Sequence, residues 1–537
     1  MSKIKYQDLS ILVADDFGSF RSLVNTMLTE LGVSDIEMAS NGDQVIEKCK
    51  QKKYDVVLCD YDLGEGRNGQ HVLEALRHYN YLSRSSIFIV VSAEASRNIV
   101  MSAYDCEPDD YLMKPITAMI LRQRIERLLA QKDSLRPVYT ALDEGNMETA
   151  TDLLIDLSIS EDRQASAAQK LLGQVFIEQG ELQKAEKLYI HALEARPLDW
   201  ARLGLARVKQ LKGDLDTAGD WLYQIVEENP LYLPAYDLLA ENLKQKGEKK
   251  AVQETIEKAV YVSPMSILRQ RRLAAVAEDN DDALTAIEAR RNTLKLGKLS
   301  CHGCVEDNLS FVRTVANAVQ NHSELPKELI DDATEVLSLT RQEYALSSEQ
   351  ESRCRLLEGR VSACLGDITK AKACIDDAIA EATIQGIDAD IELILLLLSI
   401  NAEDQVERFL KELQEKYRDD QEALEKLDQF LSEPASHSNR RLVAEANKEG
   451  IALYTQGEFD RAIACFEKAR TVFPKHVGIG LNIVQAVIGK LKSTPEDEAL
   501  KEECHSILNA VESIIDNSHS QYQRFIKLKK ISEVFLL

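Results

Sequence analysis

Acidic residues follow two short apolar runs in the first quarter of the chain. Asp15 and Asp16 come directly after Ile11–Ala14. Asp60 follows Val56–Cys59 in the same way. Carboxylates that converge on one point repel one another unless a hard cation lies between them, and oxygen ligands beside phosphate chemistry favour Mg²⁺. These residue types therefore predict a magnesium site, with Asp60 as the nucleophile that accepts a phosphoryl group.

A hydroxyl and an ammonium group follow two later apolar runs. Ser92 comes after Ile87–Val91, and Lys114 comes after Tyr111–Met113. Attack on a phosphoryl group requires mainly positioning and neutralisation of charge. The Lys114 ammonium supplies positive charge, and the Ser92 hydroxyl donates to a phosphoryl oxygen. Together with the aspartates, these residues predict an aspartyl phosphate as the product.

The elements that must position these residues are short strands alternating with amphipathic helices. That alternation over residues 1–130 is typical of a parallel sheet wrapped by helices, an α/β doubly wound (βα)₅ domain. In such folds ligands bind beyond the carboxyl ends of the strands, where the candidate residues stand. We predict strands at 11–14, 36–39, 56–59, 87–91 and 111–113, and helices near 18–31, 43–51, 69–79, 95–104 and 117–130.

From about residue 134 onward the strand pattern gives way to helical repeats. Glycines and prolines recur at intervals of 33 and 34 residues, and each interval holds two helices: Gly180, Gly213 and Gly247, and Pro197, Pro230 and Pro264. Glycine turns the chain, small residues let two helices approach closely, an aromatic ring fills the gap and proline ends the second helix. This pattern resembles the tetratricopeptide repeat (TPR).

Two stretches hold complete copies of the repeat. One contains Leu172, Gly173, Phe176, Gly180, Ala185, Tyr189, Ala192 and Pro197, and the other Gly450, Leu453, Gly457, Ala462, Phe466, Ala469 and Pro474. Weaker copies begin near Gly145, Gly213, Gly247 and Gly359. We interpret 265–350 and 385–432 as degenerate helical pairs, 432–439 as a break in the array and 478–534 as a cap. Residues 1–130 are predicted to form the α/β domain, and an all-α solenoid is predicted to follow it. The solenoid consists of the N-terminal part of a TPR array at 131–300, degenerate TPR-like helical repeats at 301–432, and a C-terminal TPR with capping helices at 440–537.

The chemical residues at the strand ends resemble, in order and position, the receiver domain of two-component response regulators over residues 1–130. The resemblance implies that Asp60 takes its phosphoryl group from a phosphohistidine on a sensor histidine kinase or a phosphotransfer protein. It implies no enzymatic activity beyond self-catalysed phosphorylation and dephosphorylation of the aspartate. It also implies that Mg²⁺ is held by Asp15, Asp16, the Asp60 side chain and the backbone carbonyl of Asp62.

The same resemblance implies a switch. Ser92 is expected to move toward the phosphoryl group while the Tyr111 ring turns inward, and the bond before Pro115 is expected to be cis and to help aim Lys114. The chain departs from the family after Asp60, where 61–69 is glycine-rich and longer than usual.

Composition limits the functions further. The 537 residues include 65 Lys and Arg against 89 Asp and Glu, a net charge of −24. A chain this acidic argues against a nucleic-acid-binding function, since phosphate binding needs a basic face. No apolar stretch reaches the roughly 18 residues that argue for a membrane span, and the N-terminus lacks a signal-peptide core. Ten scattered cysteines fit a reduced compartment, so we expect a cytoplasmic protein that binds neither DNA nor membrane.

One cysteine pair has a spacing that occurs in metal sites. It lies in the sequence Cys301-His302-Gly303-Cys304. A single pair of this kind, without a second pair at metal-binding spacing, is weak evidence for zinc or for a redox site.

The helical array is the predicted output, because no DNA-binding or catalytic motif follows the receiver. TPR grooves bind peptides, helices or other proteins without catalysis. The first hypothesis is a phosphorylation-controlled binding protein that modulates a sensor kinase or a sister regulator in a phosphorelay. Its groove is expected to bind a protein or peptide, and a homodimer would add a second copy of the chain as a partner. The alternative is an adaptor that delivers a client, such as a sigma or anti-sigma factor, to a protease or other enzyme. A third hypothesis, a hidden enzyme in 265–350, lacks a convergent catalytic set.

Overall fold

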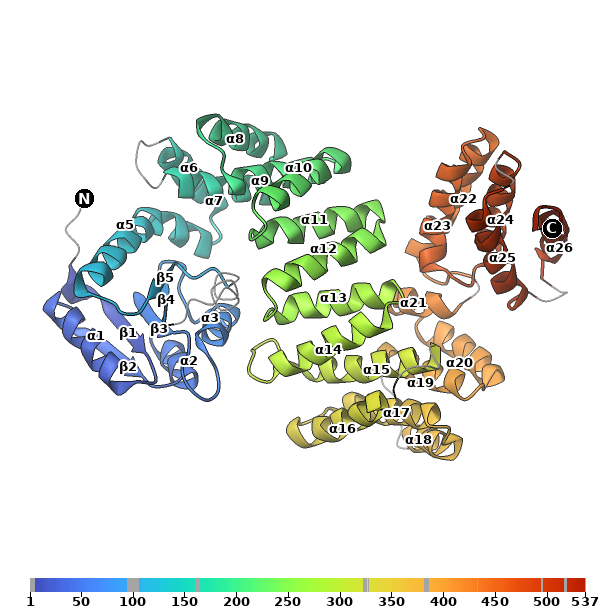
Figure 1. The fold of residues 1–537 in the computed structure, drawn as a ribbon, viewed down its shortest axis with the longest axis horizontal. Coiled ribbons are helices and arrows are strands. Elements are labelled where there is room, and N and C mark those ends of the chain that lie inside the picture. Colours follow the sequence, from blue (N-terminus) through green and yellow to red (C-terminus); the bar gives the residue numbers. More distant parts are fainter. Residues whose placement is uncertain are drawn as a thin grey trace. The chain divides into compact units, whose positions relative to one another are not determined.

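An α/β domain precedes a long helical region in the computed structural model (Figure 1). The structure describes residues 5–93, 106–159, 165–321, 326, 328–380, 386–431, 433–493, 496–515 and 519–536. The chain forms two compact units, Met1–Thr314 and Val315–Leu537, and each is treated by itself below.

Five parallel strands form one sheet in the order β2-β1-β3-β4-β5. Every residue of β3 and β4 is buried, because helices cover both faces of the sheet. The five predicted strands are confirmed, each with one further residue at one end. They are β1 (Ser10–Ala14), β2 (Asp35–Ala39), β3 (Val56–Asp60), β4 (Ile87–Ser92) and β5 (Asp110–Met113).

Two layers of helices enclose this sheet. On one face, Val24 of α1 (Gly18–Glu30) and Ile125 of α5 (Ala118–Asp143) belong to one buried cluster. On the other face, Val45 of α2 (Gly42–Gln51) and Leu73 of α3 (Gly69–His78) belong to a second cluster. The helices predicted near 18–31, 43–51 and 69–79 are therefore confirmed, and the helix predicted near 95–104 lies outside the described residues.

The helix α5 is longer than predicted. It was expected to end near residue 130, and it continues to Asp143 (Figure 1). Leu121 and Ile125 in its first half pack beneath the sheet. Leu135 and Val138 in its second half pack in the core of the first helical repeats. The prediction was wrong because 131–143 buries an apolar face of its own, so the helix continues through Pro137 into the array.

Within the first unit, consecutive helices pack on one another from α5 to α14. They are α6 (Met147–Ser158), α7 (Ala165–Glu178), α8 (Leu182–Ala195), α9 (Asp199–Leu211), α10 (Leu215–Glu228), α11 (Leu233–Lys246), α12 (Lys249–Val262), α13 (Ile267–Asp279), α14 (Ala283–Gly297) and α15 (Val305–Asn321), the last of which runs into the second unit. Turn glycines hold left-handed backbone angles, as at Gly180 (φ 75°) and Gly213 (φ 84°), where a side chain would be strained.

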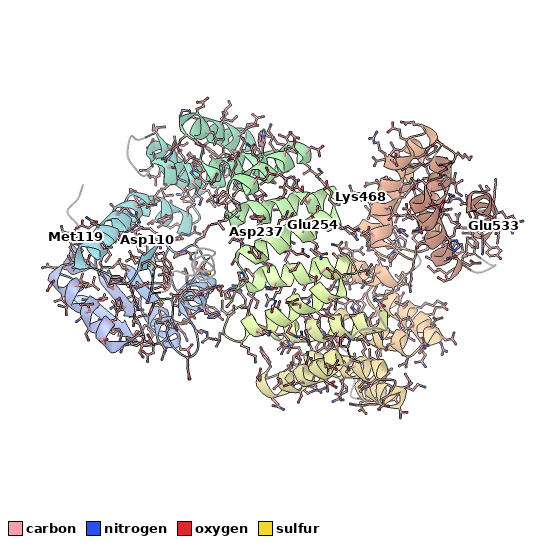
Figure 2. All side chains as sticks on the ribbon, viewed as in Figure 1. Asp110, Met119, Asp237, Glu254, Lys468 and Glu533 are labelled. Carbon is pink, nitrogen blue, oxygen red and sulfur yellow. The ribbon has the colours of Figure 1, made fainter. Side chains whose placement is uncertain are left out.

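Helices also fill the stretches predicted as degenerate repeats and as a cap. The second unit contains α16 (Glu328–Glu343), α17 (Ser348–Cys364), α18 (Ile368–Ala380), α19 (Ile387–Ser399), α20 (Glu403–Lys416), α21 (Gln421–Leu427), α22 (His437–Thr455), α23 (Phe459–Val472), α24 (Val477–Leu491), α25 (Glu498–Glu512) and α26 (Tyr522–Leu536). Acidic side chains such as Glu254 on α12 and Glu533 on α26 lie on the surface of each unit (Figure 2). Among the helices that the structure describes, none has the length and apolarity to cross a bilayer.

The glycine–aromatic pairing of the repeat is visible in both units. Tyr189 of α8 is buried, and a Cβ atom on Gly173 or Gly204 would lie within 2.4 Å of its side chain. In the second complete copy, a Cβ atom on Gly450 would lie 2.5 Å from the buried ring of Phe466. The helices of each pair approach this closely only because these positions lack side chains.

One buried carboxylate organises the turn before α22, in the stretch that the sequence predicts as a break in the array. Asp428 is fully buried, and its two oxygens accept hydrogen bonds from Ala435 N, Ser436 N, Ser436 Oγ and Asn439 Nδ2 at 2.6–3.3 Å. The turn before α22 therefore depends on Asp428.

Replacing Asp428 with alanine is expected to destabilise the second unit by about 3 kcal/mol, because several buried donors lose their acceptor. Urea unfolding of the full chain measures this as a lower transition midpoint. Asp419→Ala is the control, since the side chain of Asp419 is 93% exposed and its ion pair is at 3.9 Å. Equal midpoints for the two variants would contradict this role of Asp428.

Candidate functional site

The three aspartates predicted to hold a cation lie together at one edge of the sheet. Asp15 and Asp16 directly follow β1, and Asp60 ends the neighbouring β3. One carboxylate oxygen of each lies within 4.8 Å of the others. Asp15 is 0% and Asp60 5% exposed, whereas Asp16 is exposed. The structure thus brings the three side chains together, as predicted for residues at the carboxyl ends of parallel strands.

Lys114 joins the two buried aspartates from the end of β5. Its Nζ lies 2.6 Å from Asp15 Oδ2 and 2.7 Å from Asp60 Oδ2. Its backbone N–H donates to the carbonyl oxygen of Ser92 at 2.8 Å, which ties the ends of β4 and β5 together. The peptide bond between Lys114 and Pro115 is cis.

The electrostatics of the site leave excess negative charge. Burial, reinforced by the neighbouring charge of Asp15, raises the pKa of Asp60 to about 6, although Lys114 acts in the opposite direction. Burial works against the charge of Lys114, but its hydrogen bonds to Asp15 and Asp60 outweigh burial and raise the pKa of the ammonium group. One ammonium group does not neutralise three carboxylates, and this all-oxygen donor set fits a hard divalent cation.

Without a divalent cation, the stability of the folded protein is expected to fall as Asp60 ionises. The folded protein keeps this proton up to about pH 6, whereas the unfolded carboxyl titrates near 3.8, so the unfolding free energy decreases between these values. Mg²⁺ is therefore expected to raise Tm more at about pH 7.5 than at about pH 5. Thermal unfolding with Mg²⁺ or with a chelator measures this. In Asp60→Asn most of the difference should disappear, and an equal Mg²⁺ effect at both pH values in the wild type would contradict the assignment.

The loop between β3 and α3 follows directly from the acceptor residue. A Cβ atom on Gly69 would lie 2.5 Å from the carbonyl oxygen of Asp60, so α3 begins against the end of β3. Gly64 and Gly66 take φ angles of 76° and 100°, which accounts for the glycine-rich sequence. The exposed carboxylate of Asp62 accepts from Gly64 N at 3.1 Å, and the role of its backbone carbonyl stays a prediction.

The predicted switch residues lie on adjacent strands. Ser92 ends β4 and is 3% exposed, and half-buried Tyr111 pairs in register with Val90. The segment 94–105 between them lies outside the described residues. Their roles as a switch pair stay a prediction.

Two residues of α1 that the sequence analysis missed also contact the site. The Lys114 ammonium lies 4.3 Å from the centre of the Phe20 ring, a cation–π contact. Arg21 donates to the backbone carbonyl oxygens of Asp15 and Asp16. These residues hold the site from the first turns of α1, and no spacing in the sequence marks them.

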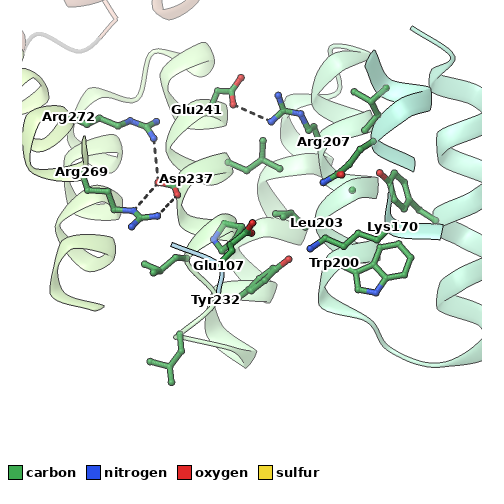
Figure 3. Close-up of a pocket in the computed structure, with 18 residues that line it drawn as sticks. Glu107, Lys170, Trp200, Leu203, Arg207, Tyr232, Asp237, Glu241, Arg269 and Arg272 are labelled. Carbon is green, nitrogen blue, oxygen red and sulfur yellow. Dashed lines mark hydrogen bonds and ion pairs between the residues drawn. The ribbon is translucent and has the colours of Figure 1, made fainter. Parts of the chain in front are cut away.

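A second feature is a cavity of about 680 Å³ on the helical array (Figure 3). Aromatic and basic side chains line it, among them Trp200, Tyr232 and Arg207, and Glu107 of the α/β domain reaches it (Figure 3). Asp237 pairs with Arg269 at 2.7 Å within the cavity wall. The cavity therefore combines apolar surface with paired charges.

Comparison with known families agrees with this architecture. Residues 11–126 match the family described as response regulator receiver domain, and residues 170–232 match the tetratricopeptide repeat. The chain joins a response regulator receiver domain to tetratricopeptide repeats. The receiver holds the aspartate cluster, and the TPR region holds the cavity.

Curated and solved relatives align with the receiver part. Chemotaxis protein CheY-3 of Vibrio cholerae is 27% identical over 128 residues, which are 24% of this chain and 97% of that protein. Chemotaxis protein CheY of Pseudomonas aeruginosa is 28% identical over 120 residues, 22% of this chain and 95% of that protein. A solved CheY-like receiver domain protein of Methanospirillum hungatei is 23% identical, covers 24% of this chain and 98% of its own, and has a TM-score of 0.22.

Proposed function

We propose that this protein is a phosphorylation-controlled response regulator of a two-component phosphorelay, in which Asp60 is the phosphoryl acceptor. The observation that carries the proposal is the pair of buried carboxylates, Asp15 and Asp60, that share the Lys114 ammonium at the sheet edge. A carboxylate oxygen of Asp60 attacks the phosphorus of a phosphohistidine on a histidine kinase or a phosphotransfer protein. The new P–O bond replaces the P–N bond, and the imidazole leaves and takes up a proton.

The residues at the sheet edge have separate roles in this step. Lys114 pairs with the incoming negative charge, and the Ser92 hydroxyl donates to a phosphoryl oxygen. Asp15, Asp16, Asp60 and the carbonyl of Asp62 would hold Mg²⁺, which supplies charge neutralisation for the phosphoryl oxygens when bound. No other catalytic activity is needed for this function.

The output is protein binding by the TPR region. The cavity beside Trp200 and Arg207 supports a protein or peptide ligand, and modulation of a sensor kinase or sister regulator is the role that we assign to it.

The receiver contacts the array through α3 and the loop just before it. Arg67 Nε donates to Leu299 O at 3.1 Å, and Ser300 Oγ lies 3.4 Å from a carboxylate oxygen of Glu74. Phosphorylation at Asp60 would shift the receiver between conformations and so change these contacts.

The test compares wild type and Asp60→Ala, each with and without acetyl phosphate and Mg²⁺. The measurements are hydrogen exchange in α3 and 298–304 and affinity for the cognate kinase or phosphotransfer protein. Phosphodonor is expected to change exchange and affinity in the wild type alone. Glu65→Gln, an exposed change in the loop after β3, is expected to behave as the wild type. Equal values in all four states would contradict phosphorylation control.

A further inference from the structure

Three side chains with metal-binding atoms meet away from the aspartate cluster. His78 lies at the end of α3, and Cys301 and His302 lie in the loop between α14 and α15. One ring nitrogen of each histidine and the thiol sulfur lie within 4.8 Å of one another. The two imidazole rings are 5.0 Å apart between centres and inclined at 76°. A receiver residue and two array residues thus converge on one point.

The loop that carries Cys301 and His302 is held in place by its own contacts. A Cβ atom on Gly303 would lie 2.1 Å from the carbonyl oxygen of Gly297, so the loop folds closely back on the end of α14. The buried carboxylate of Asp307 accepts from Cys304 N at 3.1 Å and from both Nε and Nη2 of Arg271, at 2.6 and 2.7 Å. Arg271 also donates to the carbonyl oxygen of His302. The backbone at the cluster is therefore fixed before any ligand binds.

The receiver side of the cluster also contacts this loop. Glu74 lies one helical turn before His78, on the same side of α3. Its carboxylate is 3.4 Å from Ser300 Oγ, next to Cys301 in the loop. A cavity of about 550 Å³ opens beside the cluster and is lined by Glu74, His78 and His302, among others. This leaves room for a fourth ligand, either the Glu74 carboxylate or a water molecule.

We infer that His78, Cys301 and His302 form a zinc site that fastens the receiver to the array. Two imidazole nitrogens and one thiolate are a donor set that suits Zn²⁺, with distances of about 2.0–2.3 Å to the metal. Donors so bound would lie about 3.3–3.6 Å apart, so small side-chain rotations close the present cluster on the ion. Arg271, the cation that contacts the His302 backbone, has its own charge paired with Asp307 at 2.6 Å.

Cys304 stands apart from this site. It is exposed, and its sulfur lies 3.7 Å from Arg271 Nη2 and 3.6 Å from Asp307 Oδ2. The proposed ligands are therefore Cys301, the neighbouring His302 and the distant His78. The spacing of Cys301 and Cys304 has no part in the site. This distinction separates the proposal from a chelate formed by the CxxC sequence alone.

The test titrates the full chain, freed of metal by a chelator and kept reduced, with Co²⁺ as a spectroscopic probe in excess Mg²⁺. One equivalent of Co²⁺ is expected to give a thiolate-to-cobalt charge-transfer band, and Zn²⁺ is expected to displace it. Cys301→Ser is expected to remove the band. His78→Gln is expected to weaken Co²⁺ affinity by at least ~10-fold, because loss of a residue that only hydrogen-bonds a metal ligand already lowers metal affinity by that factor. Cys304→Ser is the matched control and keeps band and affinity.

Several results would overturn the site. They are absence of a stoichiometric thiolate band, a band that survives Cys301→Ser, unchanged affinity in His78→Gln, or loss of the band in Cys304→Ser. Circular dichroism of each metal-free variant shows that the variant is folded, so that loss of binding reflects loss of a ligand. The proposal is independent of the phosphoacceptor function, because phosphoryl incorporation in Cys301→Ser with Mg²⁺ is expected to equal that of the wild type.

Discussion

Asp60→Asn is expected to abolish phosphoryl incorporation from acetyl phosphate and Mg²⁺, because the amide cannot form the acyl phosphate. The wild type is expected to gain the mass of one phosphoryl group in intact-mass spectrometry. Lys114→Ala keeps the acceptor but loses the ammonium that contacts Asp15 and Asp60 at 2.6 and 2.7 Å. Its incorporation rate is expected to fall by about 100-fold, as when one stabilising donor is removed from a transition state.

The control for both variants is Glu65→Gln, which removes an exposed carboxylate from the loop after β3. Its incorporation is expected to equal that of the wild type. Phosphoryl incorporation by Asp60→Asn at the wild-type level, or mapping of the phosphoryl group to another residue of the wild type, would refute Asp60 as the acceptor.

Gly204→Val is expected to lower the stability of the first unit by about 3 kcal/mol, the upper range for overpacking a core. A Cβ atom at this position would lie 2.3 Å from Cζ of Tyr189, which is 2% exposed and is confined on its other side by Gly173. The added side chain therefore overlaps the ring unless the ring leaves its buried position. The midpoint of urea unfolding and Tm measure the change.

A double variant separates steric conflict from other causes. In Gly204→Val combined with Tyr189→Ala, the space left by the ring receives the new side chain, so the loss of stability should be smaller than the sum of the single losses. Gly18→Ala is the control, since its Cβ atom would meet only the end of the Arg21 side chain, at 3.5 Å. Strictly additive losses in the double variant would show that the glycine–tyrosine contact is not the cause.

The sheet was predictable because β1, β3 and β4 contain continuous apolar runs bounded by polar residues. Burial on both faces restricts β3 and β4 to apolar residues along most of their length. The predicted ends of these strands agree with the structure to within one residue. The end of α5 was not predictable in this way. Leu135 and Val138 are buried by the array, a partner that a local pattern at 117–130 does not reveal.

The same contrast applies to the sites. Asp15, Asp60 and Lys114 were identified because parallel strands carry the residues after them to one edge, so order along the chain specifies proximity. Phe20 and Arg21 support that edge from a helix, where no register links them to the strands. His78 meets Cys301 and His302 only through packing of the receiver on the array, and the spacing of Cys301 and Cys304 does not reveal that distant histidine.

The continuous helix α5 has a mechanical consequence. At 1.5 Å per residue its 26 residues form a lever about 39 Å long. The Thr117 side chain caps the near end by accepting from Ile120 N at 3.3 Å, and Leu121 and Ile125 hold this end in the receiver core. A tilt of about 5° there would carry Asp143 through about 3 Å, given that length. Bending of the lever would concentrate at Pro137, where the ladder of backbone hydrogen bonds lacks a donor.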